Sequence, residues 1–241
     1  MKMRYLWLAC LLVFTVAKAD PIVVGFGFHK PPYIFENQRT GLEFELVEAA
    51  FKAAAIEIQP FFASQGRLHA MMEMSQLDAI VTTNEQSGVK AYYSDVYIIY
   101  RNYAISLAKR KLKIDVIEDL SSYSITAFQR AYTNLGPRYQ SAVDQSLQYV
   151  EQAQQKTRNL MLFSGRVDVA IGDKRIFGYF NNEISNEVDA TQPTTYHDIF
   201  PPTPYKVAFR NVATRDRFNK GLAEIRKNGT YTTIEKKYSK Y

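Results

Sequence analysis

The feature that most constrains the fold is a regular alternation of short apolar runs with stretches of helical spacing. Residues 22–28, 56–62 and 77–81 are short, apolar runs that include β-branched side chains, which predicts strands. Between them, residues 41–55 and 68–74 carry apolar side chains every three or four positions, which predicts helices. Strands that alternate with helices form βαβ units, so we expect an α/β fold with a mostly parallel sheet.

The same alternation begins again in the second half of the chain. Strands are predicted at 124–128, 147–150 and 167–171, and helices from about 133 and over 152–163. A second series of βαβ units implies a second sheet, because the two series are separated by other extended segments. The sequence therefore predicts two lobes of similar architecture.

Two segments, one from each series, resemble each other residue by residue. MMEMSQLDAIV starts at position 71 and MLFSGRVDVAI at position 161, a constant offset of 90 residues. The match places Ser75 opposite Gly165 and Asp78 opposite Asp168. Each segment has the pattern of a helix end, a tight turn, an aspartate and a buried strand, so one unit is used at the same stage of both lobes.

Two extended apolar segments, Tyr103–Lys109 and Tyr205–Arg210, bracket the second series. The simplest organisation inserts one lobe into the other, with residues 20–107 and 206–241 in lobe 1 and residues 108–205 in lobe 2. Two chain crossings make a hinge. The carboxyl ends of the strands in both lobes would then face a cleft that can close on a small ligand.

The first 19 residues are typical of a secretory signal peptide. Lys2 and Arg4 precede an apolar stretch, and Ala-Lys-Ala at 17–19 is a small-residue cleavage signal. We expect cleavage after Ala19 and a periplasmic location. The only cysteine, Cys10, lies in this segment, so the mature chain has no disulfide and depends on its hydrophobic core.

The distribution of charge and the absence of several motifs argue against a nucleic-acid-binding protein and against common classes of enzyme. The formal net charge is +6, three units of which lie in the first 19 residues, and the remaining basic residues are dispersed, so we expect no nucleic-acid partner. The sequence contains no nucleotide-binding loop, no metal-ligand spacing and no G-x-S-x-G motif. We therefore expect no enzymatic activity, no cofactor and no metal.

Several motifs, in a consistent order, resemble those of periplasmic solute-binding proteins of family 3, which serve polar amino-acid ABC transporters. They are PPY at 31–33, TGLEFEL at 40–46, LDAI at 77–80, YSDVY at 93–97, GRVDVAIGD at 165–173, NGT at 228–230 and KKY at 236–238. The resemblance covers nearly all of the mature chain. It implies a two-lobed periplasmic-binding-protein fold (type II) with two hinge strands, each lobe a mostly parallel sheet flanked by helices. It also implies a monomer that binds an amino-acid-like ligand and delivers it to an ABC permease in the inner membrane.

Asp173 follows the buried run at the end of GRVDVAIGD and is the leading site candidate. The resemblance implies that its carboxylate holds the α-amino group of a ligand, which suits a charge-assisted hydrogen bond in a dry cleft. The alternative is that Asp173 caps the helix predicted at 174–180, since aspartate is a favoured N-cap residue. Both roles are compatible with the sequence.

The cation that would hold a ligand's carboxylate is missing from its usual place. Relatives usually carry an arginine shortly before the segment that corresponds to YSDVY, and the matching position here is Ser87. Lys90 is nearby but lacks the planar fork of a guanidinium. Arg130, after a predicted strand end, and Arg67, at a predicted helix start, are the candidate replacements; an arginine in either place is more often a surface residue than an anchor.

The remaining candidates lie at predicted strand ends, helix starts or the Pro-Pro loop, where side chains and backbone N–H groups can reach a ligand. They are Thr82, Thr83, Gln129, Tyr132, Thr133, Phe28 and Tyr33. His29 and Lys30, in the same loop, could contact an acidic or polar part of the ligand.

Two other functions are compatible with the same fold. The lobes could signal to a membrane partner as a stand-alone or sensory binding protein. A periplasmic dehydratase is the third possibility, with Asp173 as the acid and Arg130 as a clamp on a carboxylate. Turnover of a prephenate-like substrate would distinguish this enzyme from a binding protein.

Overall fold

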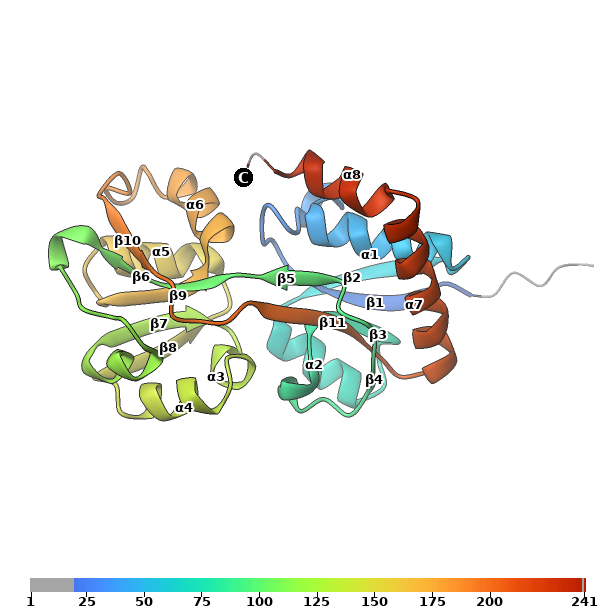
Figure 1. Cartoon of the computed structure of the whole chain (residues 1–241), viewed down its shortest axis with the longest axis horizontal. Coiled ribbons are helices and arrows are strands. Elements are labelled where there is room, and N and C mark those ends of the chain that lie inside the picture. The colour runs from blue at the N-terminus through green and yellow to red at the C-terminus, as the bar shows by residue number, and fades with distance from the viewer. Residues whose placement is uncertain (1–19, 240) are drawn as a thin grey trace, which may run out of the picture.

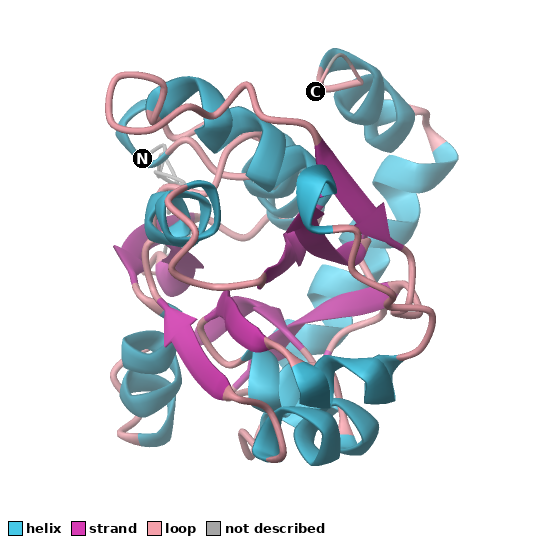
Figure 2. Ribbon diagram, turned by 90° about the vertical axis from the view of Figure 1, so that its left-hand side faces the viewer, coloured by secondary structure: helices cyan, strands magenta, loops and turns pink. Residues whose placement is uncertain are grey.

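The computed structural model describes residues 20–239 and residue 241, so the predicted signal peptide and its cleavage site lie outside the described residues. The described chain forms two lobes, each with its own sheet (Figure 1). Figure 2, which views the molecule from the side of the second lobe, shows helices on both sides of the strands. In the part of the chain that is described, no helix combines the length and the apolar character needed to cross a membrane.

The first lobe contains a six-stranded sheet in the order β2-β1-β3-β11-β4, with β5 paired to β11. Its strands are β1 (Ile22–Gly27), β2 (Ile58–Ala63), β3 (Ala79–Thr83), β4 (Tyr92–Tyr93), β5 (Ile98–Tyr100) and β11 (Thr203–Phe209). Its helices are α1 (Leu42–Ala53), α2 (Gln65–Glu73), α7 (Val212–Lys227) and α8 (Thr230–Lys237).

The second lobe contains a five-stranded sheet in the order β10-β6-β9-β7-β8. Its strands are β6 (Asn102–Leu107), β7 (Ser124–Phe128), β8 (Gln148–Gln152), β9 (Val169–Asp173) and β10 (Thr194–His197). Its helices are α3 (Ala131–Asn134), α4 (Pro137–Asp144), α5 (Gln155–Phe163) and α6 (Lys174–Glu183).

The expectation of mostly parallel sheets holds for the centre of each lobe. Strands β2, β1 and β3 are parallel to one another, and so are β8, β7 and β9. The strands next to the crossings, β11 in the first sheet and β6 in the second, pair antiparallel with β3 and β9. These strands do not belong to βαβ units, so the right-handed crossover that makes neighbours parallel does not apply to them.

The internal match found in the sequence corresponds to equivalent structure. Ser75 and Gly165 both take a left-handed backbone conformation, with φ of 59° and 72°. Asp78 accepts the backbone N–H of the second residue of β1 at 2.8 Å, and Asp168 accepts that of the first residue of β7 at 3.0 Å. Each aspartate thus fixes the start of the neighbouring parallel strand.

The chain changes sheets earlier than the sequence predicts. Strand β5 pairs with β11 in the first sheet, whereas β6 pairs with β9 and β10 in the second. We infer a first crossing at Arg101, not at the predicted boundary after residue 107, and a return between His197 and Thr203. The prediction fails because the apolar pattern of residues 103–109 fits an inner strand of either sheet. In Figure 1, β5 and β11 run side by side toward the second lobe.

Helix α7 packs so closely on α1 that a side chain has no room at one position. A Cβ atom added to Gly221 would lie 2.1 Å from the backbone oxygen of Ala50. A Cβ atom added to Gly178, on the exposed side of α6, would have no atom of the described residues within 4 Å.

We expect Gly221→Ala to lower the free energy of unfolding by about 1–3 kcal/mol, because the added methyl group forces the two helices apart. Gly178→Ala is the matched control and should raise it by about 0.5–1 kcal/mol, because alanine is the better helix former. Urea unfolding of both variants measures the difference. Equal effects would show that the α1–α7 approach is not tight.

Candidate ligand site between the lobes

A cavity of about 60 Å³ lies between the two lobes. In the first lobe its wall includes residues at the carboxyl ends of β1 and β3 and at the start of α2. In the second lobe it includes the ends of β7 and β9 and the start of α5. This is the location expected for a ligand in parallel α/β sheets. The described residues contain no cluster of three or more His, Cys, Asp or Glu side chains that could hold a metal ion.

Glu43 of α1 is completely buried beside the cavity and organises its first-lobe wall. It accepts hydrogen bonds from the hydroxyl groups of Thr82, Tyr97 and Tyr100. Lys30 Nζ lies 3.1 Å from Glu43 Oε2 and donates to Thr82 Oγ1 at 3.0 Å. Burial alone would raise the pKa of the Glu43 carboxyl, but the Lys30 ammonium and the three hydroxyl donors outweigh it and hold that pKa below its ordinary value.

Asp173, at the end of β9, lines the cavity but is already fully engaged. Its Oδ1 accepts the backbone N–H groups of Arg175 at 2.9 Å and Ile176 at 3.3 Å, so it is the N-cap of α6. Its Oδ2 accepts the Tyr33 hydroxyl at 3.1 Å and the Arg101 N–H at 3.3 Å. Burial raises the pKa of the Asp173 carboxyl, and these four hydrogen bonds only partly oppose that rise. The capping role is confirmed, and an ammonium group must compete with these donors.

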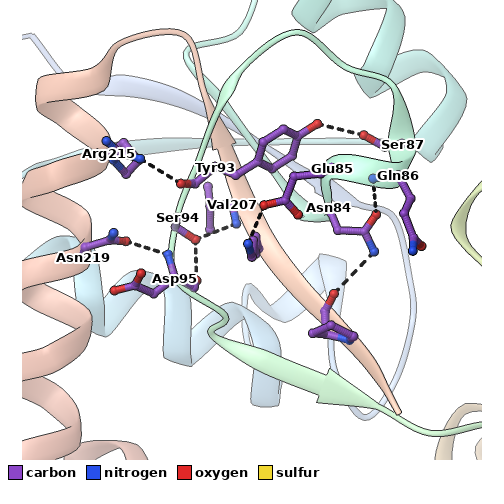
Figure 3. Close-up of polar contacts among 12 residues, drawn as sticks. Asn84, Glu85, Gln86, Ser87, Tyr93, Ser94, Asp95, Val207, Arg215 and Asn219 are labelled. Carbon is purple, nitrogen blue, oxygen red and sulfur yellow. Dashed lines mark hydrogen bonds and ion pairs between the residues drawn. The ribbon is translucent and has the colours of Figure 1, made fainter. Parts of the chain in front are cut away.

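The position expected for an arginine is filled by a network of short polar contacts (Figure 3). Ser87 is buried, and its Oγ lies 3.0 Å from the Tyr93 hydroxyl. The Tyr93 hydroxyl donates to the Val89 carbonyl at 2.8 Å. Glu85 in the same segment forms an ion pair with Lys206 at 2.5 Å. The segment therefore contributes no cation to the cavity.

Neither arginine proposed as a replacement lines the cavity. Arg130 donates from Nη2 to the Ser87 carbonyl at 2.8 Å, which is a contact between the lobes. Arg67 is exposed and lies over the Phe61 ring, with 5.8 Å between Cζ and the ring centroid. The predicted helix start and strand end are correct in outline, but both side chains point elsewhere because polar and aromatic partners are available outside the cavity.

The other predicted residues divide into three groups. Phe28, Thr82 and Gln129 line the cavity. Thr83 and Tyr33 are buried outside its wall, Tyr33 in contact with Asp173. Tyr132 and Thr133 are not part of the wall, and the Tyr132 hydroxyl donates to Asp144 at 3.1 Å.

The cation that does line the cavity is Arg158 of α5, which the sequence analysis missed. Its side chain is 1% exposed and donates to the Ile171 carbonyl at 2.5 Å and to Gln155 Oε1. Burial lowers its pKa to about 10, although the nearby Asp173 carboxylate opposes this shift. Gly172 makes room for it, since a Cβ atom there would lie 2.3 Å from Arg158 Nη1. An arginine within a helical pattern gives no sequence signal of burial.

We expect Glu43→Gln to lower the free energy of unfolding by about 3–5 kcal/mol, because it leaves the Lys30 ammonium buried without a carboxylate. Glu48→Gln, at an exposed position of the same helix, is the control and should change stability by less than about 0.5 kcal/mol. Urea unfolding at neutral pH measures both. A small effect at Glu43 would show that Lys30 finds another partner or reaches water.

The same carboxylate should make stability depend on pH in the acid range. Folding lowers the pKa of Glu43 from its ordinary value of 4.5, so its contribution is complete above that value and is lost as the pH falls through the folded-state pKa. The stability difference between the wild type and Glu43→Gln should therefore narrow below about pH 4.5. Urea titrations at a series of pH values test this, and a constant difference would contradict it.

Comparison with known proteins agrees with the two-lobed fold. The family model for bacterial extracellular solute-binding proteins, family 3, matches residues 22–241. Among solved structures, an ancestral arginine-binding protein bound to glutamine is 19% identical, with a TM-score of 0.74 over 92% of this chain and 98% of that one. No curated protein sequence matches this chain.

Two further solved structures have the same fold. A histidine kinase sensor domain with similarity to periplasmic binding proteins is 18% identical, with a TM-score of 0.76 over 90% of this chain and 95% of that one. The arginine-, lysine-, histidine-binding protein ArtJ from Geobacillus stearothermophilus is 18% identical, with a TM-score of 0.72 over 91% of this chain and 95% of that one. The family match extends over almost all described residues, and this chain belongs to the bacterial extracellular solute-binding proteins, family 3.

Proposed function

We propose that this chain is a periplasmic binding protein that closes on a small polar ligand, an amino acid or amino-acid-like compound, and delivers it to an ABC permease. The observation that carries the proposal is the cavity between the lobes, whose wall combines side chains of both sheets. A site built from two lobes can release its ligand when the lobes separate and exclude water when they close. Family membership and the amino-acid-binding proteins of the same fold support this ligand class.

Contacts between the lobes support a closing motion. The Gly66 N–H donates to Gln129 Oε1 at 2.9 Å, and the Tyr33 hydroxyl donates to Asp173. Ile176 and Phe180 of α6 pack into the hydrophobic core of the first lobe. These contacts join two lobes that have separate sheets, so rotation at the two crossings can break them without unfolding either lobe.

A sensory role is the second candidate. It is favoured by the histidine kinase sensor domain, whose fold is similar over most of both chains. Ligand binding and hinge closure are common to both roles. Transport of the identified ligand by the candidate permease, reconstituted with and without this protein, distinguishes them.

A dehydratase is not supported by the arrangement that it would need. Asp173 lines the cavity, but the Arg130 guanidinium, its expected partner on the substrate, lies outside the wall. The two groups therefore do not face one bound molecule. One similar structure is that of an ancestral precursor of cyclohexadienyl dehydratase. This precursor is an amino-acid-binding protein.

We expect the chain without residues 1–19 to be stabilised by at least one compound in a screen of amino acids, polyamines and small carboxylates. A ligand that binds only the folded protein, at one hundred times its Kd, adds about 2.7 kcal/mol and raises the melting temperature. Asp173→Asn removes the charge and keeps a good N-cap residue, so it should weaken binding of an ammonium-bearing ligand about tenfold or more.

Asp216→Asn, at an exposed site in α7, is the control and should leave every shift unchanged. Thermal unfolding and titration calorimetry measure both variants. If no compound of the three classes raises the melting temperature, the proposed function is contradicted.

A further inference from the structure

The cavity wall contains a buried arginine, Arg158, whose charge and hydrogen-bond donors are only partly matched by the described residues. Arg158 is 1% exposed, and no carboxylate of the described residues lies within ion-pair distance of it. Its hydrogen bonds engage Nη1 and Nη2 with neutral oxygens, and its buried Nε has no hydrogen-bond partner among the residues that the structure describes. A buried guanidinium without an anion is costly, so an anion that enters the cavity would be strongly favoured.

The surrounding backbone is shaped to admit this side chain. At Gly172, a Cβ atom would lie 2.3 Å from Nη1 and 3.1 Å from Cζ of Arg158. Any other residue at this position of β9 would displace the guanidinium from its place beside the strand. Gly172 directly precedes Asp173. The end of β9 therefore places the Arg158 guanidinium and the capping carboxylate of Asp173 in the same part of the cavity wall.

The other charges in the wall are already matched. Lys30 and Glu43 form an ion pair in the first lobe, and the two oxygens of Asp173 accept four hydrogen bonds. Asp173 acts on Arg158 only at a distance, through its field. Among these cavity residues, Arg158 is therefore the group with donors left for an incoming anion.

The first lobe places a complementary acceptor in the same wall. Gln65 uses its amide nitrogen to donate to the carbonyls of Val81 and Thr82, which fixes the orientation of the side chain. Its Oε1 atom is buried and accepts no hydrogen bond from the described part of the chain. A ligand that offers an O–H or N–H donor to Gln65 satisfies an acceptor that is otherwise empty.

We propose that Arg158 anchors the ligand from the second lobe by binding a carboxylate, and that the ligand is a small carboxylic acid whose own donor group reaches Gln65 in the first lobe. This inference rests on the proposed function and specifies its ligand. The cavity of about 60 Å³ has room for roughly four to six water-sized groups. In this closed arrangement it therefore takes acids of the size of acetate, lactate or alanine.

The test compares each acid with its primary amide, which keeps the shape and removes the charge. The probes are acetate and acetamide, L-lactate and L-lactamide, and L-alanine and L-alaninamide, measured by thermal shift and calorimetry on the wild type. At least one acid should bind, and its amide should bind about 10- to 100-fold more weakly because the charge-assisted hydrogen bond is lost. Comparing the affinities of lactate and alanine shows whether a hydroxyl or an ammonium group donates to Gln65.

Variants then identify the anchor. Arg158→Gln should weaken binding of the acid by the same factor, and Arg158→Lys, which keeps the charge, should retain part of the affinity. Arg166→Gln, an exposed arginine of the same lobe, should leave binding unchanged. If Arg158→Gln does not fold, the comparison of acid and amide on the wild type still decides whether a carboxylate is required.

The outcomes separate this inference from the proposed function. Binding of an acid that Arg158→Gln leaves intact, or binding of the amides as tightly as the acids, overturns the role of Arg158. Binding only of polyamines or of larger amino acids also overturns it, while the proposed function stands. If neither these probes nor the broader screen produces a shift, both are overturned.

Discussion

The buried carboxylate of Glu43 is the interaction on which the geometry of the site depends. Through its two oxygens it joins the Pro-Pro loop, the end of β3 and the strand that leads to the first crossing, by way of Lys30, Thr82 and Tyr100. A fully buried anion is tolerated only when its charge and all its lone pairs are matched, and here a cation and three hydroxyl groups do so. Any movement of these segments would leave part of that charge unmatched, so the first-lobe wall is held in one arrangement.

This constraint extends to the second lobe through aromatic contacts. The Tyr100 ring stacks on Tyr33 with 4.0 Å between centroids, and the Tyr33 hydroxyl donates to Asp173. Asp173 in turn caps α6, whose residues Ile176 and Phe180 pack on the first lobe. The path from Glu43 to α6 is thus a continuous series of packed and hydrogen-bonded groups, and the closed arrangement of the lobes depends on the last of them.

The sequence predicts the parts of this structure that follow from local patterns. The βαβ units, the second series and the equivalence of Asp78 and Asp168 follow from spacing and turn chemistry, because these act within a few residues. The position of the first crossing cannot be predicted from local patterns. The sequence of β6 suits either sheet, and its partners, β9 and β10, lie far away in the chain.

The site follows the same division. Asp173 is predictable because it comes at a strand end and before a helix, where a carboxylate has a local role as N-cap. Glu43 and Arg158 are not, because each lies in a helix whose sequence is compatible with an exposed charge. Their burial results from tertiary contacts: hydroxyl groups from two other segments, β3 and residues 97–100, around Glu43, and the space beside Gly172 for Arg158. Arg130 is the opposite case. Its position after a strand end predicts a side chain that faces the cavity, but the side chain turns to the Ser87 carbonyl.

The distribution of charge between the lobes determines how closure would act on a bound anion. The first-lobe wall presents an ion pair, Lys30 with Glu43, that is already neutralised, whereas Arg158 on the second lobe retains unused donors. Electrostatic attraction strengthens as water is excluded and the local dielectric falls. An anion held by the second lobe is therefore bound more tightly when the first lobe covers it, even though that lobe adds no net charge. Closure and affinity are coupled in this way through burial of one guanidinium, which replaces the arginine that the segment around Ser87 lacks.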